Sequence, residues 1–175
     1  LYWSQIETAD GVYDWSAFDT AIAPWIANGK KIIPRMMPSG WASWNPPHSA
    51  QGTPSFVLSS IKHYTNGKGW VVPAYWDATY KAKLQAFIAA FGARYNGNPA
   101  IEFVHVAPGM GGECKPDTDS NVAGAQKSLL SIGYSNDLWL QHIKDVAGYY
   151  QAAFPNTLLG CQTAANFWSG GGSKH

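Results

Sequence analysis

The chain has few charged side chains and few long apolar runs, and these shortages exclude several classes of protein. Only 13% of its 175 residues are charged, against roughly 25% in an average soluble domain, and the formal net charge is +1. We therefore expect no nucleic acid and no anionic membrane surface as partner, because both require clustered positive charge. No apolar run approaches the roughly 20 residues of a membrane helix, so no membrane span is expected.

The signature motifs of several enzyme classes are also missing. The chain lacks a Gly-x-Ser-x-Gly elbow, a His-Glu-x-x-His zinc motif and a phosphate-loop signature. Residues 109–113 begin like a dinucleotide-binding turn, but Cys114 stands where the third glycine belongs and Pro116 follows instead of a helix. Residues 117–121 have calcium-like acidic spacing without the glycine and late glutamate of an EF-hand. No cofactor and no metal are expected.

Only two cysteines occur, Cys114 and Cys161, each at or near a predicted strand. Two cysteines alone do not make a zinc site. They can face each other on neighbouring strands as a disulfide, or remain two buried thiols, as free cysteines often do.

Aromatic side chains, in contrast, are abundant. The chain has nine tryptophans and nine tyrosines, and with its low charge this composition is typical of a secreted or cell-surface protein that handles sugars. Its length suits one domain with a sizeable core. We therefore expect a carbohydrate partner and an extracellular or cell-surface location.

Apolar periodicity alternates between helical and extended segments. Helices are predicted over 14–28, 77–95 and 136–154, where apolar residues recur at helical spacing. Strands are predicted over 31–37, 101–107 and 157–162, and residues 1–4 have the pattern of the tail of a first strand. Strands separated by helices indicate βαβ units and a parallel sheet. The expected fold is α/β, of the parallel (β/α) TIM-barrel type, as a partial barrel spanning residues 1–175 as one segment.

The predicted connections are unequal in length. Links from helix to strand are short, whereas the strand-to-helix links, 38–76 and 108–135, are long. Long loops in a compact domain are usually functional. They leave the same ends of the strands, so they are expected on one face, which is the active face of such sheets.

Glu113 is the candidate catalytic residue. The chain has only three glutamates, and Glu113 alone follows a predicted buried strand and a glycine-rich turn. A carboxylate at the carboxyl end of a parallel strand is where α/β barrel enzymes keep catalytic groups. Glu102 lies within the strand pattern and Glu7 in a different turn.

Candidate substrate-binding residues are aromatic or polar side chains near the predicted strand ends: Trp3, Arg35, Trp41, Trp44, His48 and Trp168. Indole rings form flat platforms for the C–H faces of sugars, or pack a loop onto the rim of the fold. Arg35 can bind a carboxylate or a hydroxyl, or serve as a structural ion-pair partner. His105 alternates with apolar neighbours in its predicted strand, so it can point into the mouth of the barrel or be a core histidine, and a core histidine is expected.

Residues 3–19 resemble the Trp-x-x-x-Glu-Pro-x-x-Gly-x-Tyr-Asp-Phe/Trp segment of clan A glycoside hydrolases, above all microbial β-galactosidase-type barrels. Residues 80–101 are similar to the helix and entry of that family's fourth strand, which ends in the acid/base glutamate. The resemblance implies that Glu113 is the general acid/base of an O-glycosyl hydrolase acting on a β-linked oligo- or polysaccharide. It also implies that the chain covers about strands two to five of a larger catalytic domain.

The sequence departs from that family in two places. Gly112 stands where the family usually has an asparagine that contacts the sugar 2-hydroxyl. The family's nucleophile ends the seventh strand, and no glutamate follows Glu113, although retaining hydrolysis needs two carboxylates about 5–5.5 Å apart. Either the remaining barrel half or self-association is expected to complete the fold. The alternative function is a non-catalytic carbohydrate-binding or self-assembling surface protein on a degenerate hydrolase scaffold.

Overall fold

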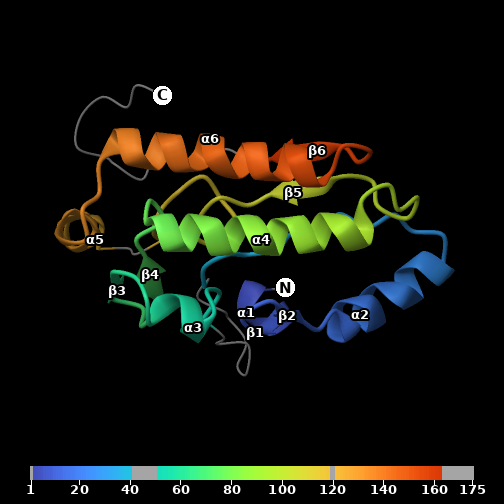
Figure 1. The fold of residues 1–175 in the computed structure, drawn as a ribbon, viewed down its shortest axis with the longest axis horizontal. Coiled ribbons are helices and arrows are strands. Elements are labelled where there is room, and N and C mark those ends of the chain that lie inside the picture. The colour runs from blue at the N-terminus through green and yellow to red at the C-terminus, as the bar shows by residue number, and fades with distance from the viewer. Residues whose placement is uncertain (1, 41–50, 119–120, 163–175) are drawn as a thin grey trace.

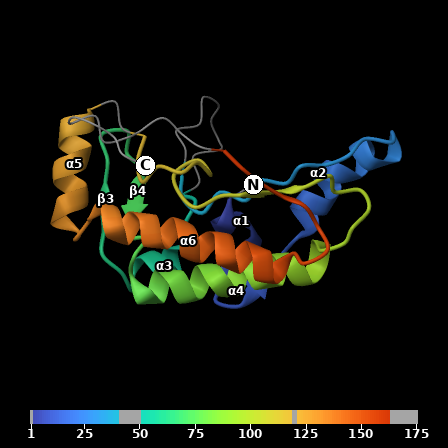
Figure 2. The same ribbon diagram turned by 90° about the horizontal axis from the view of Figure 1, so that it is seen from above.

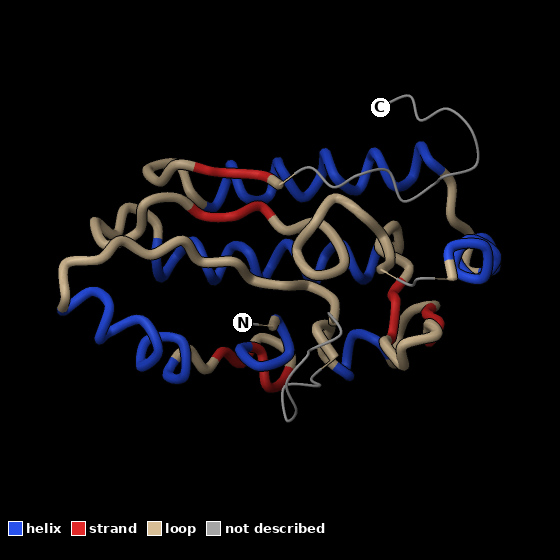
Figure 3. The backbone as a smooth tube through the Cα atoms, turned by 180° about the vertical axis from the view of Figure 1, so that it is seen from behind, coloured by secondary structure: helices blue, strands red, loops and turns tan. Residues whose placement is uncertain are grey.

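Two long helices form one layer of the fold. In the computed structural model, which describes residues 2–40, 51–118 and 121–162, α4 (Ala78–Tyr95) and α6 (Asn136–Ala153) lie side by side (Figure 1). The short strands β5 (Val104–Val106) and β6 (Leu159–Cys161) form a second layer with the extended segment 30–40. Figures 2 and 3 show this layer on one side of the helix pair.

Pairing in the second layer is parallel. In the β5–β6 sheet, Val104 lies opposite Leu159 and Val106 opposite Cys161. Isolated parallel bridges continue the layer by joining Arg35 to His105, Ser39 to Met110, Ile32 to Ile101 and Tyr2 to Met37. The two other sheets are antiparallel hairpins: β1 (Glu7–Ala9) with β2 (Val12–Tyr13), and β3 (His63–Thr65) with β4 (Val71–Pro73).

The predicted TIM-barrel type, including the partial barrel over residues 1–175, is wrong. Within the described ranges every sheet has two strands and two of the three sheets are antiparallel, so the fold is mixed α/β without a barrel. One physical reason for the missing barrel is Pro34, which lies within the predicted strand 31–37. The Pro34 carbonyl accepts a 3.0 Å hydrogen bond from the His105 amide, but Pro34 has no N–H to continue the ladder. The predicted strand 31–37 is therefore reduced to single bridges.

The three predicted helices are confirmed, with ends within two residues. The first is α2 (Ser16–Ala27), and α4 and α6 are the other two. Asp77 caps α4, since its carboxylate accepts from the amides of Thr79 and Tyr80 at 2.8 and 3.3 Å. Within the described part of the chain, no helix has the length and apolar character needed to cross a bilayer.

Three further helices were not predicted. They are α1 (Trp3–Ile6), which stands in place of the strand expected at 1–4, α3 (Ser55–Leu58) and α5 (Val122–Ser131). Two side chains that recur at the apolar spacing of the predicted helices, Trp25 and Leu140, are 61% and 50% exposed. Apolar periodicity therefore located the helices better than it located every buried face.

The core is built on the apolar stripe of α4. The side chains of this stripe are at most 3% exposed: Tyr80, Leu84, Phe87, Ile88, Phe91 and Tyr95. Trp3 stacks on Phe87 at 5.5 Å between ring centroids, and Trp15 stacks on Phe91 at 5.7 Å. Full burial of one such side chain contributes roughly 1.5–3 kcal/mol. These contacts hold the N-terminal segment against α4.

The other side of α4 approaches α6 closely at Gly92. A β-carbon added at Gly92 would lie 2.2 Å from the carbonyl oxygen of Ala153, at the end of α6. Nearby, the rings of Phe91 and Phe154 pack edge to face at 5.0 Å. The helix pair therefore requires a residue without a side chain at position 92.

We predict opposite effects for alanine at Gly92 in α4 and Gly148 in α6. Gly92→Ala should lower the free energy of unfolding by about 1–2 kcal/mol, because forced overpacking outweighs the gain of about 1 kcal/mol in helix propensity. Gly148→Ala should raise it by about 0.5–1 kcal/mol, because a β-carbon there meets nothing within 4 Å. Denaturant unfolding measures both, and equal gains would contradict the close crossing.

Candidate functional site

Glu113 lies in a hydrogen-bonded turn that follows β5. The Gly112 amide donates to the Gly109 carbonyl at 2.9 Å, and the Met110 amide donates to the Lys115 carbonyl at 3.0 Å. Gly111 and Gly112 have φ angles of 63° and 75°, in the left-handed region that favours glycine. The glycine-rich sequence thus folds into a closed turn that sets the backbone position of Glu113.

Buried polar contacts hold both ends of this turn. Before it, Nε2 of buried His142 in α6 donates to the Pro108 carbonyl at 2.8 Å. After it, the Tyr75 hydroxyl donates to the Pro116 carbonyl at 3.0 Å. The fully buried Asp117 carboxylate accepts from the Tyr64 hydroxyl at 2.6 Å and from Nδ2 of Asn66 at 2.7 Å. The helix layer and the β3–β4 hairpin therefore both position the turn.

The Glu113 carboxylate is largely buried, and its two oxygens have different partners. Its side chain is 12% exposed. Oε2 forms an ion pair with Nζ of Lys115 at 2.7 Å. Among the described residues, Oε1 has only a long contact of 3.4 Å with Nε2 of Gln162, just after β6. Oε1 is therefore the oxygen that can exchange its partner at low cost.

Arg35 and His105 stand next to Glu113. They face each other in a parallel bridge, and a β-carbon added at Gly112 would lie 2.5 Å from Nε of Arg35. Burial first, and then the charge of Arg35, lower the pKa of His105, while Glu113 acts in the opposite direction. The imidazole of His105 is therefore neutral at neutral pH.

The structure thus brings together Arg35 and Glu113, both predicted from sequence, and adds three residues that sequence reasoning missed as site residues: His105, Lys115 and Gln162. The alternation of His105 with Val104 and Val106 was the available signal, since alternate residues of a strand point to opposite faces. Lys115 and Gln162 carried no comparable signal, because their positions depend on the turn and on the end of β6.

The other predicted site residues do not join this cluster. Trp3 is fully buried, with no exposed ring face on which a sugar could stack, and its indole N–H donates to the Glu7 carboxylate. Glu7 also accepts from the Gly11 amide at 2.8 Å. The remaining candidates lie outside the described residues: Trp41, Trp44, His48 and Trp168.

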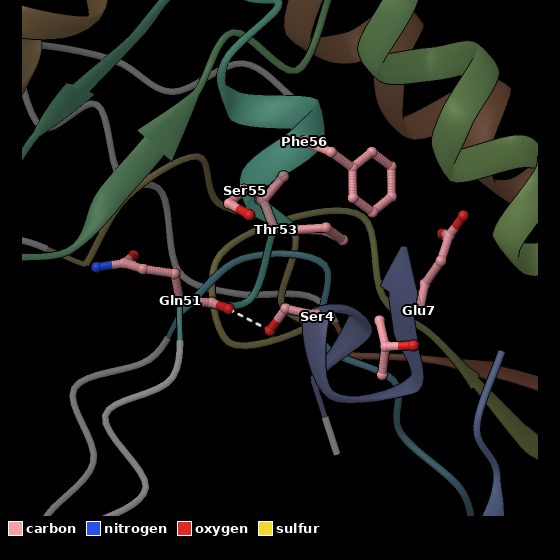
Figure 4. A pocket seen from close by; sticks show the side chains of 8 residues that line it. Ser4, Glu7, Gln51, Thr53, Ser55 and Phe56 are labelled. Atoms are coloured by element: carbon pink, nitrogen blue, oxygen red, sulfur yellow. Dashed lines mark hydrogen bonds between the residues drawn. The ribbon is translucent and has the colours of Figure 1, made fainter. Parts of the chain in front are cut away.

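A separate polar pocket of about 240 Å³ lies between the N-terminal elements and α3 (Figure 4). It is lined by hydroxyl, amide and carboxylate side chains with one aromatic ring: Ser4, Glu7, Thr8, Gln51, Thr53, Pro54, Ser55 and Phe56. The Ser4 hydroxyl donates to the Gln51 carbonyl across it. Glu113, Arg35 and His105 do not line this pocket, so it is distinct from their cluster.

Two further observations bear on function. Among the described residues, no group of three His, Cys, Asp or Glu side chains is arranged to hold a metal ion. Compared with known proteins, the chain matches no protein-family model and no curated protein.

We predict that His142 makes stability depend on pH. Burial lowers the pKa of His142 from 6.5 to about 4, so between these values the unfolded chain binds a proton that the folded chain does not. The contribution of neutral His142 to the free energy of unfolding is fully present above about pH 6.5. Roughly 3 kcal/mol of that free energy is lost as the pH falls toward 4. Denaturant unfolding across this range should show a free energy of unfolding that rises with pH.

The variant His142→Gln should flatten that slope even if it is less stable, since its side chain does not titrate. His63→Gln serves as the control, because His63 is exposed. An unchanged slope in His142→Gln would contradict a neutral, buried His142.

We also predict that alanine is poorly accepted at Gly112. Gly112→Ala adds two costs: backbone strain of about 1–2 kcal/mol at φ +75° and a collision with Arg35. Gly29→Ala is the matched control, since φ is +70° there and a β-carbon meets nothing within 4 Å. Gly112→Ala should lose about 1–3 kcal/mol more stability than the control by denaturant unfolding. Equal losses would argue against close packing of Arg35 on the turn.

Proposed function

We propose that this chain carries the proton-transfer part of a glycoside-hydrolase site, with Glu113 as general acid/base on a β-linked oligo- or polysaccharide. The observation that carries the proposal is the Glu113 carboxylate itself. It is largely buried, it lies in a backbone-closed turn at the end of β5, and it retains one weakly bound oxygen. General acid/base catalysis requires a carboxyl group with these properties within reach of the glycosidic oxygen.

The two oxygens of Glu113 take different roles in the proposed reaction. Lys115 holds Oε2 at 2.7 Å and orients the carboxyl group. Oε1 exchanges its 3.4 Å contact with Gln162 for the glycosidic oxygen of the substrate. In the first step the protonated Oε1 gives its proton to the glycosidic oxygen, which leaves as a second carboxylate bonds to the anomeric carbon. In the second step Oε1 takes a proton from the water that displaces this carboxylate.

Arg35 supplies the hydrogen-bond donor for the sugar 2-hydroxyl, a role that the resemblance assigns to an asparagine. The residue before the acid/base glutamate is Gly112, and the guanidinium of Arg35 lies against it. Its N–H groups are fixed donors that suit sugar hydroxyls and the charge of Glu113. The neutral imidazole of His105 adds a further hydrogen-bonding group beside them.

A specific observation favours a second candidate, carbohydrate binding without hydrolysis. Besides Glu113, two buried carboxylates occur in the described ranges, Glu7 and Asp117, and both are held by structural donors. Hydrolysis needs a partner carboxylate about 5–5.5 Å away for retention, or about 6.5–9.5 Å away for inversion. Without one, the same cluster binds a sugar and does not cleave it.

We predict that Glu113→Gln lowers turnover of nitrophenyl β-glycosides and β-linked oligosaccharides by about 10²–10⁴-fold, because the glutamine amide keeps the shape but cannot act as a general acid or base. Binding of the same oligosaccharides, measured by calorimetry, should survive. Glu102→Gln is the matched control, since Glu102 is exposed on the same segment, and its turnover should equal that of the wild type.

The outcomes separate the two candidates. Turnover by the wild type that is lost in Glu113→Gln and kept in Glu102→Gln supports the hydrolase. Sugar binding without turnover in all three proteins supports the binding function and overturns the hydrolase. No turnover and no binding of any β-linked sugar overturns both.

A further inference from the structure

The two cysteines meet beside the candidate site. Sγ of Cys114 lies 3.5 Å from Sγ of Cys161, although the residues are 47 positions apart in the chain. Both are free thiols in this structure. We infer that Cys114 and Cys161 are a dithiol pair that closes to a disulfide under oxidising conditions and links the Glu113 turn to β6. The inference does not depend on the proposed function.

Ordered backbone on both sides fixes this approach. Cys161 is paired in the β5–β6 sheet, where it lies opposite Val106. Cys114 belongs to the turn closed by the hydrogen bond from the Met110 amide to the Lys115 carbonyl. A disulfide needs the sulfurs at about 2.0 Å, so they must move together by about 1.5 Å, which is within reach of side-chain rotation. The pair therefore needs no rearrangement of the strand.

The exposure of the two thiols sets the order of reaction. Cys161 is exposed and Cys114 is partly buried. Burial first, and then its contact with Cys161 and the charge of Glu113, raise the pKa of Cys114 to about 12. Because thiolates are the attacking species, Cys161 reacts first with an external oxidant and Cys114 resolves the product.

With oxidised glutathione as oxidant, each step balances. The Cys161 thiolate attacks one glutathione sulfur, the glutathione disulfide breaks, and one glutathione leaves as a thiolate. Cys114 then loses its proton to solvent and attacks Sγ of Cys161, and the second glutathione leaves as a thiolate. The protein thiols lose two electrons and two protons, and oxidised glutathione is reduced to two glutathione molecules.

The cross-link would join the two chain segments that lie next to the Glu113 carboxylate. Cys114 follows Glu113 directly, and Gln162, which contacts Oε1 of Glu113, follows Cys161. Oxidation therefore ties together the two segments that the 3.4 Å contact joins only weakly. We expect the oxidised protein to have a higher thermal midpoint than the reduced protein, because the link constrains the unfolded chain.

Peptide mapping tests the inference directly. The reduced protein is incubated with oxidised glutathione, remaining thiols are blocked with iodoacetamide, and the chain is digested with trypsin without reduction. Cleavage after Arg94, Lys127, Lys144 and Lys174 yields peptide 95–127 with Cys114 and peptide 145–174 with Cys161, since Pro116 protects the bond after Lys115. The expected product is these two peptides joined, from a monomer that has lost two hydrogen atoms.

Serine variants provide the controls. Cys114→Ser should stop with glutathione on Cys161, Cys161→Ser should form no internal link, and only the wild type should gain thermal stability on oxidation. Wild-type protein that keeps glutathione on Cys161 with Cys114 alkylated would overturn the inference. So would a disulfide between two chains in place of the internal link.

Discussion

The apolar stripe of α4 is the constraint on which the rest of the structure depends. One side of the stripe takes the indole rings of Trp3 and Trp15, which attach the N-terminal segment. The end of α4 meets α6 where Gly92 leaves room for the carbonyl of Ala153. Because α6 in turn holds Pro108 through His142, packing between helices determines where the Glu113 turn begins. Burial of aromatic area thus fixes the position of a polar site.

Polar groups, rather than a continuous sheet, then complete the placement of the turn. Pro34 interrupts the ladder next to His105, so the segment 30–40 joins the parallel layer through single bridges. On the far side of the turn, buried hydrogen bonds of the Asp117 carboxylate and the Tyr75 hydroxyl hold the chain where no ladder does. Such bonds are costly to break, because each loss leaves a buried group without its partner.

Local patterns in the sequence predicted local structure well. The helix from Ala78 to Tyr95 and the glycine turn before Glu113 both follow from neighbouring residues. The barrel prediction failed, because sheet extension depends on pairing between distant segments and on the N–H that Pro34 lacks. For the same reason the sequence could not place Arg35 beside His105. The indole ring of Trp3 suited a platform for a sugar, but in the fold this side chain is buried in the core.

The ion pair between Glu113 and Lys115 limits where a proton can move. An ammonium group only donates hydrogen bonds, so the oxygen that faces it cannot at the same time donate a proton to a ligand. Oε2 is in this position at 2.7 Å from Nζ of Lys115, which leaves Oε1 as the oxygen for proton exchange. The direction in which Oε1 points is set by the closed turn and by the ion pair of Oε2 with Lys115, not by its weak contact with Gln162. In both proposed functions the position of Oε1 therefore depends on the backbone that Gly111 and Gly112 shape.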